Sequence, residues 1–318
     1  MKVLTGMIAT VTLNPALDKT VVVPDFTIGR TNRVQVNYVD AGGKGINVAK
    51  VLKQLGSPVI ATGFLAGNNG RYISEALSSR DILTDFLYIG GETRVNLKII
   101  DSVSGTETEI NEPGFLIAGE HLEQFEQKTK ELAKRCPVMV FSGSLPPGAP
   151  PDTYAVLIRI ARECGTRTIL DTSGEALEVG LAAGPDLVKP NLAEVQELLQ
   201  IRIEAEKDLV GAARRLLEMG AGTAVISLGA AGAVAASGNR VIRARPPSVR
   251  ASSTVGAGDS MVAAFAYAMM KDLSLDEALR LATAASTATV TVRGSGVGDL
   301  RLIQEFLSQV VLEELQMH

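Results

Sequence analysis

Hydrophobic and polar positions in the second half of the chain follow two alternating periods. Short apolar runs typical of buried strands occur at 138–141, 168–171, 187–189 and 224–227. The segments between these runs repeat their apolar residues at the spacing of amphipathic helices. Strands that alternate with helices form a parallel sheet covered on both faces. The pattern therefore predicts a three-layer α/β/α fold with a mostly parallel central sheet.

The first third of the chain has a different pattern. An apolar strand is expected at 8–13, and a helix that opens at 41–45 and ends at Gly56. Further β-rich runs lie at 20–23 and 33–39, and a second group lies at 86–89, 94–100 and 106–110. No helix separates the members of the second group, so they should pair as an antiparallel sheet. We expect about 17–40 and 86–114 to form a small β lid on a single domain spanning 1–318.

A glycine-rich turn at 252–260 leads directly into the apolar run 261–270. At such a helix start, unpaired N–H groups and the positive end of the helix dipole converge and bind anions, above all phosphate. A carboxylate at Asp259 would repel a bound phosphate, but it could take a proton from a hydroxyl that attacks a phosphoryl group held there. The pattern indicates a phosphotransferase. The alternative is a tight turn whose acidic residue only favours the helix N-terminus.

Composition narrows the class of protein. The 318 residues are 46% hydrophobic and 21% charged, which is typical of a well-packed globular protein, and the net charge of −4 offers no footprint for nucleic acid. No run is long and apolar enough to span a bilayer and no signal-peptide pattern opens the chain, so we expect a cytoplasmic protein with no membrane partner. Cys136 and Cys164 lack metal-ligand spacing. The two histidines, His121 and His318, are poorly placed for a triad or a zinc site, which again favours a carboxylate as general base.

The remaining polar motifs follow the predicted strands. They lie at 14–18, 142–146, 171–174, 189–191 and 227–232, each at the carboxyl end of a strand. Folds of this class bind their ligands at that edge of the sheet. We therefore expect these motifs to line one ligand site.

Two longer motifs resemble the signatures of the ribokinase-like carbohydrate kinases of the PfkB family, over nearly the whole chain. Residues 41–49, AGGKGINVA, look like the first signature, and residues 253–260, STVGAGDS, look like the second. Residues 12–18 and 142–146 resemble the branch of the family that acts on phosphorylated hexoses. The resemblance implies that Asp259 is the catalytic base and that Gly256, Ala257 and Gly258 form the anion hole.

The resemblance also assigns a group of residues to the sugar phosphate. These are Asp18, Arg33, Gly42, Gly43, Lys44, Asn47, Arg94 and Ser144. Three of them have a plain structural alternative. Asp18 after Asn-Pro is typical of a turn, while Lys44 at a helix start and Arg33 on a strand are typical of solvated side chains.

For the nucleotide, the resemblance implies ATP as the phosphoryl donor, with Mg²⁺ held mainly by its phosphates and by water rather than by a protein metal site. The expected contacts are Lys189, Asn191, Glu194, Ser227, Gly229 and Gly232. Asn191 and Glu194 also have the spacing of a helix capping box, and both roles are compatible.

The identity of the substrate is the most specific of these expectations. Residues 93–98 and 106–111 of the lid most resemble members that act on fructose 1-phosphate. The expected reaction transfers the γ-phosphoryl of MgATP to the C6 hydroxyl, giving fructose 1,6-bisphosphate. Tagatose 6-phosphate and fructose 6-phosphate stay open as alternative substrates, and a non-catalytic sugar-phosphate sensor is a more distant one. The resemblance further implies a homodimer formed through the lid.

Overall fold

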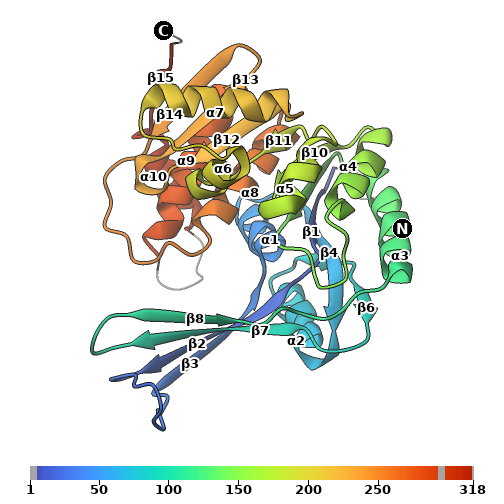
Figure 1. The fold of residues 1–318 in the computed structure, drawn as a ribbon, viewed down its shortest axis with the longest axis vertical. Helices are drawn as coiled ribbons and strands as arrows, with labels where there is room; N and C mark the ends of the chain where they lie inside the picture. Colours follow the sequence, from blue (N-terminus) through green and yellow to red (C-terminus); the bar gives the residue numbers. More distant parts are fainter. Residues whose placement is uncertain (1–5, 293–297, 317–318) are drawn as a thin grey trace.

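The computed structural model describes residues 6–292 and 298–316 as an α/β fold with a separate small sheet (Figure 1). The helices are α1 (Lys44–Gln54), α2 (Gly67–Ser78), α3 (Gly119–Ala133), α4 (Thr153–Glu163), α5 (Gly174–Leu181), α6 (Leu192–Leu199), α7 (Glu206–Glu218), α8 (Ala257–Met270), α9 (Leu275–Val290) and α10 (Leu300–Leu307), with one 3₁₀ turn, η1 (Gly229–Ala231). No helix within these described ranges has the length and apolarity needed to cross a membrane.

The larger sheet contains eleven strands and is mostly parallel, as predicted. Its strands are β1 (Ile8–Thr12), β4 (Val59–Ala66), β5 (Leu83–Thr84), β6 (Leu87–Ile89), β9 (Val138–Ser142), β10 (Arg167–Asp171), β11 (Leu187–Val188), β12 (Thr223–Ser227), β13 (Ala233–Ser237), β14 (Arg240–Arg245) and β15 (Val311–Glu314). The spatial order is β15-β14-β13-β12-β11-β10-β9-β1-β4-β5, and β6 pairs with β4. The pairs from β12 to β5 are parallel, whereas β13, β14 and β15 add antiparallel strands at one edge that the pattern had not indicated.

Both faces of this sheet are buried, which explains why its strands read as continuous apolar runs. In β9, Val138 and Val140 belong to one core cluster, while Met139 and Phe141 belong to the other. Helices α1, α2, α8, α9 and α10 contribute to the first cluster, and α3 to α7 contribute to the second. The sheet and the helices on its two faces form three layers (Figure 1). Because the central strands are parallel, their carboxyl ends all lie at the same edge of the sheet.

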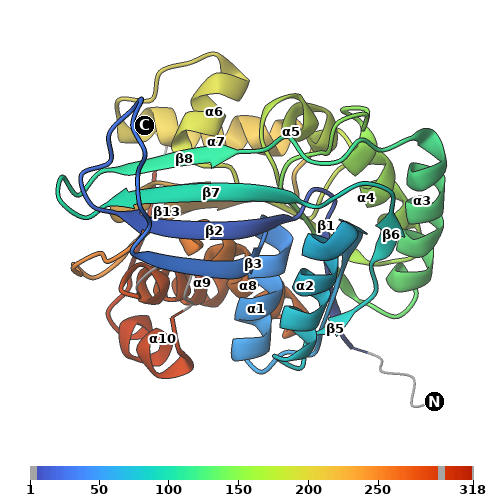
Figure 2. The same cartoon turned by 90° about the horizontal axis from the view of Figure 1, so that it is seen from below.

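The smaller sheet occupies most of the segments predicted to form the lid, and it is called the lid sheet, or lid, below. It contains β2 (Ala16–Val23), β3 (Val36–Gly42), β7 (Arg94–Asp101) and β8 (Glu107–Asn111), in the order β3-β2-β7-β8. It projects below the main body as a thin layer (Figures 1 and 2). Its own core is small, with Val21, Val23 and Ile99 buried against Phe26 and Leu97.

One detail of the predicted lid is wrong. The run 86–89 does not join it: β6 pairs in parallel with β4 of the larger sheet, because α2 separates these strands and allows a parallel crossover. The antiparallel pairing expected for 94–100 and 106–110 is confirmed by β7 and β8. β2 pairs with β7 in parallel, although both β2–β3 and β7–β8 are antiparallel.

Candidate active site

Asp259 lies in the first turn of α8 and is buried, with 8% of its surface exposed. Its Oδ2 accepts a hydrogen bond from Asn47 Nδ2 at 2.9 Å, which joins the starts of α8 and α1. Burial, followed by the negative charge of Asp171, raises the pKa of Asp259 to about 6. The carboxylate is therefore a stronger proton acceptor than an exposed aspartate and still ionised at neutral pH.

The backbone before Asp259 forms a tight turn at the N-terminus of α8. Gly256 has a left-handed φ of 77°, a conformation that favours glycine, and it stands at the N-cap of α8. The Ala257 N–H makes only a long contact of 3.5 Å to the Thr254 carbonyl. The opening amides of a helix lack partners inside it, so this turn offers N–H groups to an anion beside Asp259. A Cβ added to Gly258 would lie 3.5 Å from Lys189 Nζ, which places that ammonium group against the turn.

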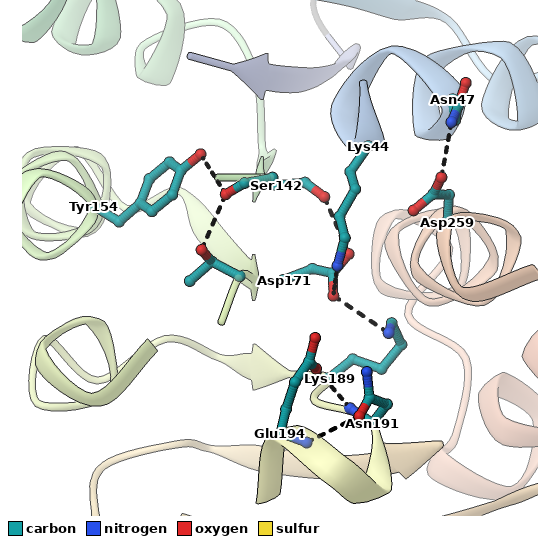
Figure 3. A network of polar contacts seen from close by, with 11 residues as sticks. Lys44, Asn47, Ser142, Tyr154, Asp171, Lys189, Asn191, Glu194 and Asp259 are labelled. Atoms are coloured by element: carbon teal, nitrogen blue, oxygen red, sulfur yellow. Dashed lines mark hydrogen bonds and ion pairs between the residues drawn. The ribbon is translucent and has the colours of Figure 1, made fainter. Parts of the chain in front are cut away.

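A buried ionic network adjoins the turn (Figure 3). Asp171, at the end of β10, is 1% exposed and forms ion pairs with Lys44 at 3.4 Å and with Lys189 at 3.2 Å. Ser142 Oγ donates to its other carboxylate oxygen at 3.1 Å. These cations keep the pKa of Asp171 below its ordinary value despite burial, and Asp171 helps to raise the pKa of Lys44. Lys44 is thus not a freely solvated lysine, although 39% of its side chain remains exposed.

Asp171 was given no role of its own in the predicted site. The only signal for it was its place at the carboxyl end of a strand, within the motif 171–174. Its partners come from elsewhere in the chain, and Lys44 is 127 residues away. Spacing in the sequence could not reveal such a contact.

The predicted nucleotide residues lie at neighbouring strand ends. Asn191 and Glu194 form the capping box of α6, each accepting the other's backbone N–H, at 2.9 and 2.8 Å. Ser227, at the end of β12, forms a parallel bridge with Asn191. In the η1 turn that follows, the Gly232 N–H donates to the Gly229 carbonyl at 3.1 Å. A Cβ on Gly232 would lie 1.9 Å from the Ala244 carbonyl, so this glycine is required by packing as well.

The predicted sugar residues at the base of the lid are close-packed. Asn96 Nδ2 donates to Asp18 Oδ1 at 2.9 Å, and burial raises the pKa of Asp18. A Cβ on Gly42 would lie 2.1 Å from Asp18 Oδ2, and one on Gly43, with φ of 114°, would lie 2.9 Å from Thr12 Cγ2. These glycines therefore admit the chain's own Asp18 and β1 at close range, and not only a ligand.

Three other predicted sugar residues are placed differently. The Arg94 guanidinium donates to the carbonyls of Asn14 and Glu112, at 3.2 and 3.1 Å. Ser144 Oγ accepts from Asn14 Nδ2 at 3.4 Å. Arg33 is exposed, ahead of β3, at the end of the lid farthest from Gly42.

A cleft of about 790 Å³ separates the lid sheet from the segment before α8. Asp18 lines it from the lid, and Ser253 and Val255 line it from the segment that leads into the Asp259 helix. Arg250 and Lys98 also line it and were not predicted; Lys98 is paired with Glu107 and Glu109 at 3.0 Å each. Among the residues that the structure describes, neither Arg94 nor Arg33 lines this cleft.

The chemistry available at this site is that of a carboxylate, two lysines and backbone N–H groups. In the part of the chain that the structure describes, no cluster of three or more His, Cys, Asp or Glu side chains could hold a metal ion. His121 accepts the Ala118 N–H through Nδ1 at the start of α3, and His318 lies outside the described residues. The carboxylate, the two lysines and the backbone N–H groups together suit the binding of a polyphosphate and the removal of a proton from a hydroxyl group beside it.

Comparisons with known proteins agree with this chemistry. Residues 12–300 match the family model described as "pfkB family carbohydrate kinase". The chain is 41% identical over 284 residues to a 1-phosphofructokinase from Rhodobacter capsulatus, which covers 89% of this chain and 90% of that protein. A solved phosphofructokinase-2 from Escherichia coli in complex with potassium superimposes with a TM-score of 0.91 at 31% identity, covering 96% of this chain and 99% of that one. The tetrameric inhibited form of the latter gives a TM-score of 0.89 at 32% identity, covering 95% and 98%.

Proposed function

We propose a reaction for this protein from the premise that the chain belongs to the pfkB family of carbohydrate kinases. The enzyme transfers the γ-phosphoryl group of ATP to the C6 hydroxyl of fructose 1-phosphate, and the product is fructose 1,6-bisphosphate. The observation that carries the proposal is the Asp259 carboxylate, buried at the start of α8 beside the turn at Gly256. The name shared by the relatives, 1-phosphofructokinase, supports the choice of sugar.

Asp259 acts as the general base in this proposal. Its carboxylate accepts the proton of the C6 hydroxyl as the oxygen attacks the γ-phosphorus, and the bond from phosphorus to the β-phosphate oxygen breaks. Asn47 holds the carboxylate by the hydrogen bond to Oδ2, which leaves Oδ1 for the hydroxyl. A pKa of about 6 keeps the group ionised at pH 7 and raises its basicity.

The charge on the transferred group is balanced by the turn and by two lysines. The N–H groups that open α8 face the equatorial oxygens, and Lys189 stands against the same turn at Gly258. Lys44 and Lys189 share Asp171, so both ammonium groups lie at one place and fit a triphosphate. Mg²⁺ accompanies the phosphates and supplies further charge neutralisation, with Asn191 and Glu194 as the polar side chains at this edge.

The sugar is proposed to lie along the start of α1. Gly42 packs against Asp18, and Asn47, five residues later, bonds to Asp259. Asp18 and Val255 line the same cleft, so the space runs from the base of the lid to the start of α8. Asp18 can accept two sugar hydroxyls. Arg250, which lines the cleft from the segment before α8, is the cation offered to the phosphate of the substrate.

The substrate is tested by ADP release from MgATP with fructose 1-phosphate, fructose 6-phosphate and tagatose 6-phosphate in parallel. We expect the highest kcat/KM with fructose 1-phosphate. A preference for either 6-phosphate would overturn the substrate while keeping the reaction class. Release of ADP that no sugar accelerates would overturn the kinase mechanism itself.

We further propose that two lids pack together in a dimer. The lid exposes large apolar side chains, including Ile28, Tyr38 and Ile110, which are 90%, 62% and 54% exposed. A group of exposed apolar side chains is typical of interaction surfaces. Its edge strands β3 and β8 each pair with a strand on one side only in the lid sheet as described. The related phosphofructokinase-2 has a solved tetrameric form. Sedimentation at micromolar concentration is expected to give a dimer, and a monomer would contradict the proposal.

A further inference from the structure

We propose that Asp171 is a positioning residue of the phosphoryl-transfer reaction, which holds the ammonium groups of Lys44 and Lys189 together beside the start of α8. The inference rests on the proposed function, because it assigns the two lysines to the transferred phosphate. It adds a residue that neither of the two signature motifs contains.

The contacts of Asp171 fit this role. Its Oδ1 is shared by both lysines, at 3.4 Å from Lys44 Nζ and 3.2 Å from Lys189 Nζ, while Oδ2 accepts Ser142 Oγ at 3.1 Å (Figure 3). The backbone carbonyl of Asp171 accepts the Gly143 N–H at 3.0 Å, which holds the ends of β9 and β10 side by side. Both carboxylate oxygens are therefore engaged, and the side chain has one fixed orientation.

The two lysines need a common partner. Lys44 starts α1 and Lys189 follows β11, so they approach from different elements and carry the same charge. A lysine side chain is long and flexible, and two ammonium groups repel each other unless an anion lies between them. Before the nucleotide binds, Asp171 is the group that keeps both ammonium groups at the site. This is preorganisation, and it removes the cost of gathering the charges during the reaction.

Asp171 also contributes to the charge around the base. The groups that act on the Asp259 carboxylate are Asp171, Lys44, Lys189 and the Asn47 amide. The negative charge of Asp171 raises the pKa of Asp259, whereas the other three lower it. Loss of folded protein alone would lower the amount of active enzyme without moving its pH dependence, so this effect separates a role at the site from a loss of folding.

The test compares Asp171→Asn with Asp186→Asn. Asp186 is a matched control at the opposite end of the sheet, where its Oδ2 accepts the Thr168 N–H at 2.7 Å and takes no part in the site. We expect Asp171→Asn to lower kcat on the order of 100-fold, as expected when reacting groups are misplaced, and to move the acid limb of kcat/KM to lower pH. Asp186→Asn is expected to leave both unchanged. A kcat within about threefold of wild type, or an acid limb that does not move, would overturn the inference.

A second comparison keeps the test decisive if the Asp171→Asn variant fails to fold. Lys189→Met and the double variant Asp171→Asn with Lys189→Met differ only in Asp171, and the double variant removes opposite charges together. The factor by which Asp171→Asn lowers kcat should be smaller when Lys189 is already replaced. The acid limb of kcat/KM should again move to lower pH. An equal loss with an unmoved limb would mean that Asp171 does not act through the lysine.

These outcomes are independent of the substrate. All variants are assayed with whichever phosphohexose the wild-type enzyme uses best. A preference for another sugar overturns the proposed substrate alone, and a wild-type-like Asp171→Asn enzyme overturns the positioning role alone.

Discussion

Replacing the catalytic carboxylate should stabilise the protein. Asp259 is buried, and its pKa of about 6 lies about two units above the ordinary value of 3.8. A folded-state pKa above the unfolded one means that the protonated form is favoured by folding. Its contribution to stability is complete below pH 3.8 and is lost as the pH rises through about 6. At neutral pH the ionised side chain is therefore a cost to the folded state.

The magnitude follows from linkage. Two pKa units correspond to about 3 kcal/mol at pH 8, where Asp259 is ionised in both states, and the difference falls to about 1.5 kcal/mol at pH 5. Asp259→Asn has the same shape, can still accept the Asn47 amide and carries no charge. We expect its free energy of unfolding to exceed that of wild type by these amounts, while turnover is lost.

Urea unfolding at pH 5 and pH 8 measures both values. Asp101→Asn is a control of opposite sign, because hydrogen bonds from Ser104 and from the Val103 N–H lower the pKa of Asp101 to about 2. That variant should lose stability. An Asp259→Asn protein that is no more stable than wild type, or whose gain is the same at both pH values, would refute the reasoning.

Three further predictions concern activity. The kcat/KM for fructose 1-phosphate should fall about tenfold per unit below pH 6, because protonated Asp259 cannot accept the hydroxyl proton; a flat profile down to pH 5 would exclude this base. Gly42→Ala places a Cβ within 2.1 Å of Asp18 Oδ2 and should raise the KM for the sugar roughly tenfold or more with little change for MgATP, while Gly211→Ala, with open space around it, serves as the control. Chelation of Mg²⁺ with EDTA should abolish ADP release, and excess Mg²⁺ should restore it; activity that persists in EDTA would exclude the metal's role.

The parts of the site that the sequence reveals are those that depend on local geometry. Gly256 and Asp259 are three residues apart, and a glycine-rich turn before an apolar helix is typical of an anion-binding helix start. The parallel strands were predictable for a similar reason, since a strand buried on both faces must be apolar throughout.

The parts that escaped depend on distant partners. Asp171 gains its role only when β10, α1 and the end of β11 meet, and Leu87–Ile89 has the same β-rich pattern whether it joins the lid or β4. The strand β13 contains three alanines in five residues, so it lacks the β-branched signal of the other strands. Pairing partners, unlike strands, are not encoded within one segment.

The way the lid joins the body has a mechanical consequence. Ala16 pairs with both Gly42 and Arg94, so β2, β3 and β7 leave the body at one line, and Asp18 lies two residues from it. A rigid rotation of the lid against the body would pivot on this line. β2 contains eight residues, or about 26 Å at 3.3 Å per residue. A rotation of about 10° then moves the tip by about 4 Å and Asp18 by only about 1 Å. The position of Asp18, and with it the contact to the sugar, would therefore change little when the lid rotates. The far end of the lid can change in length and sequence to suit a partner without altering that contact.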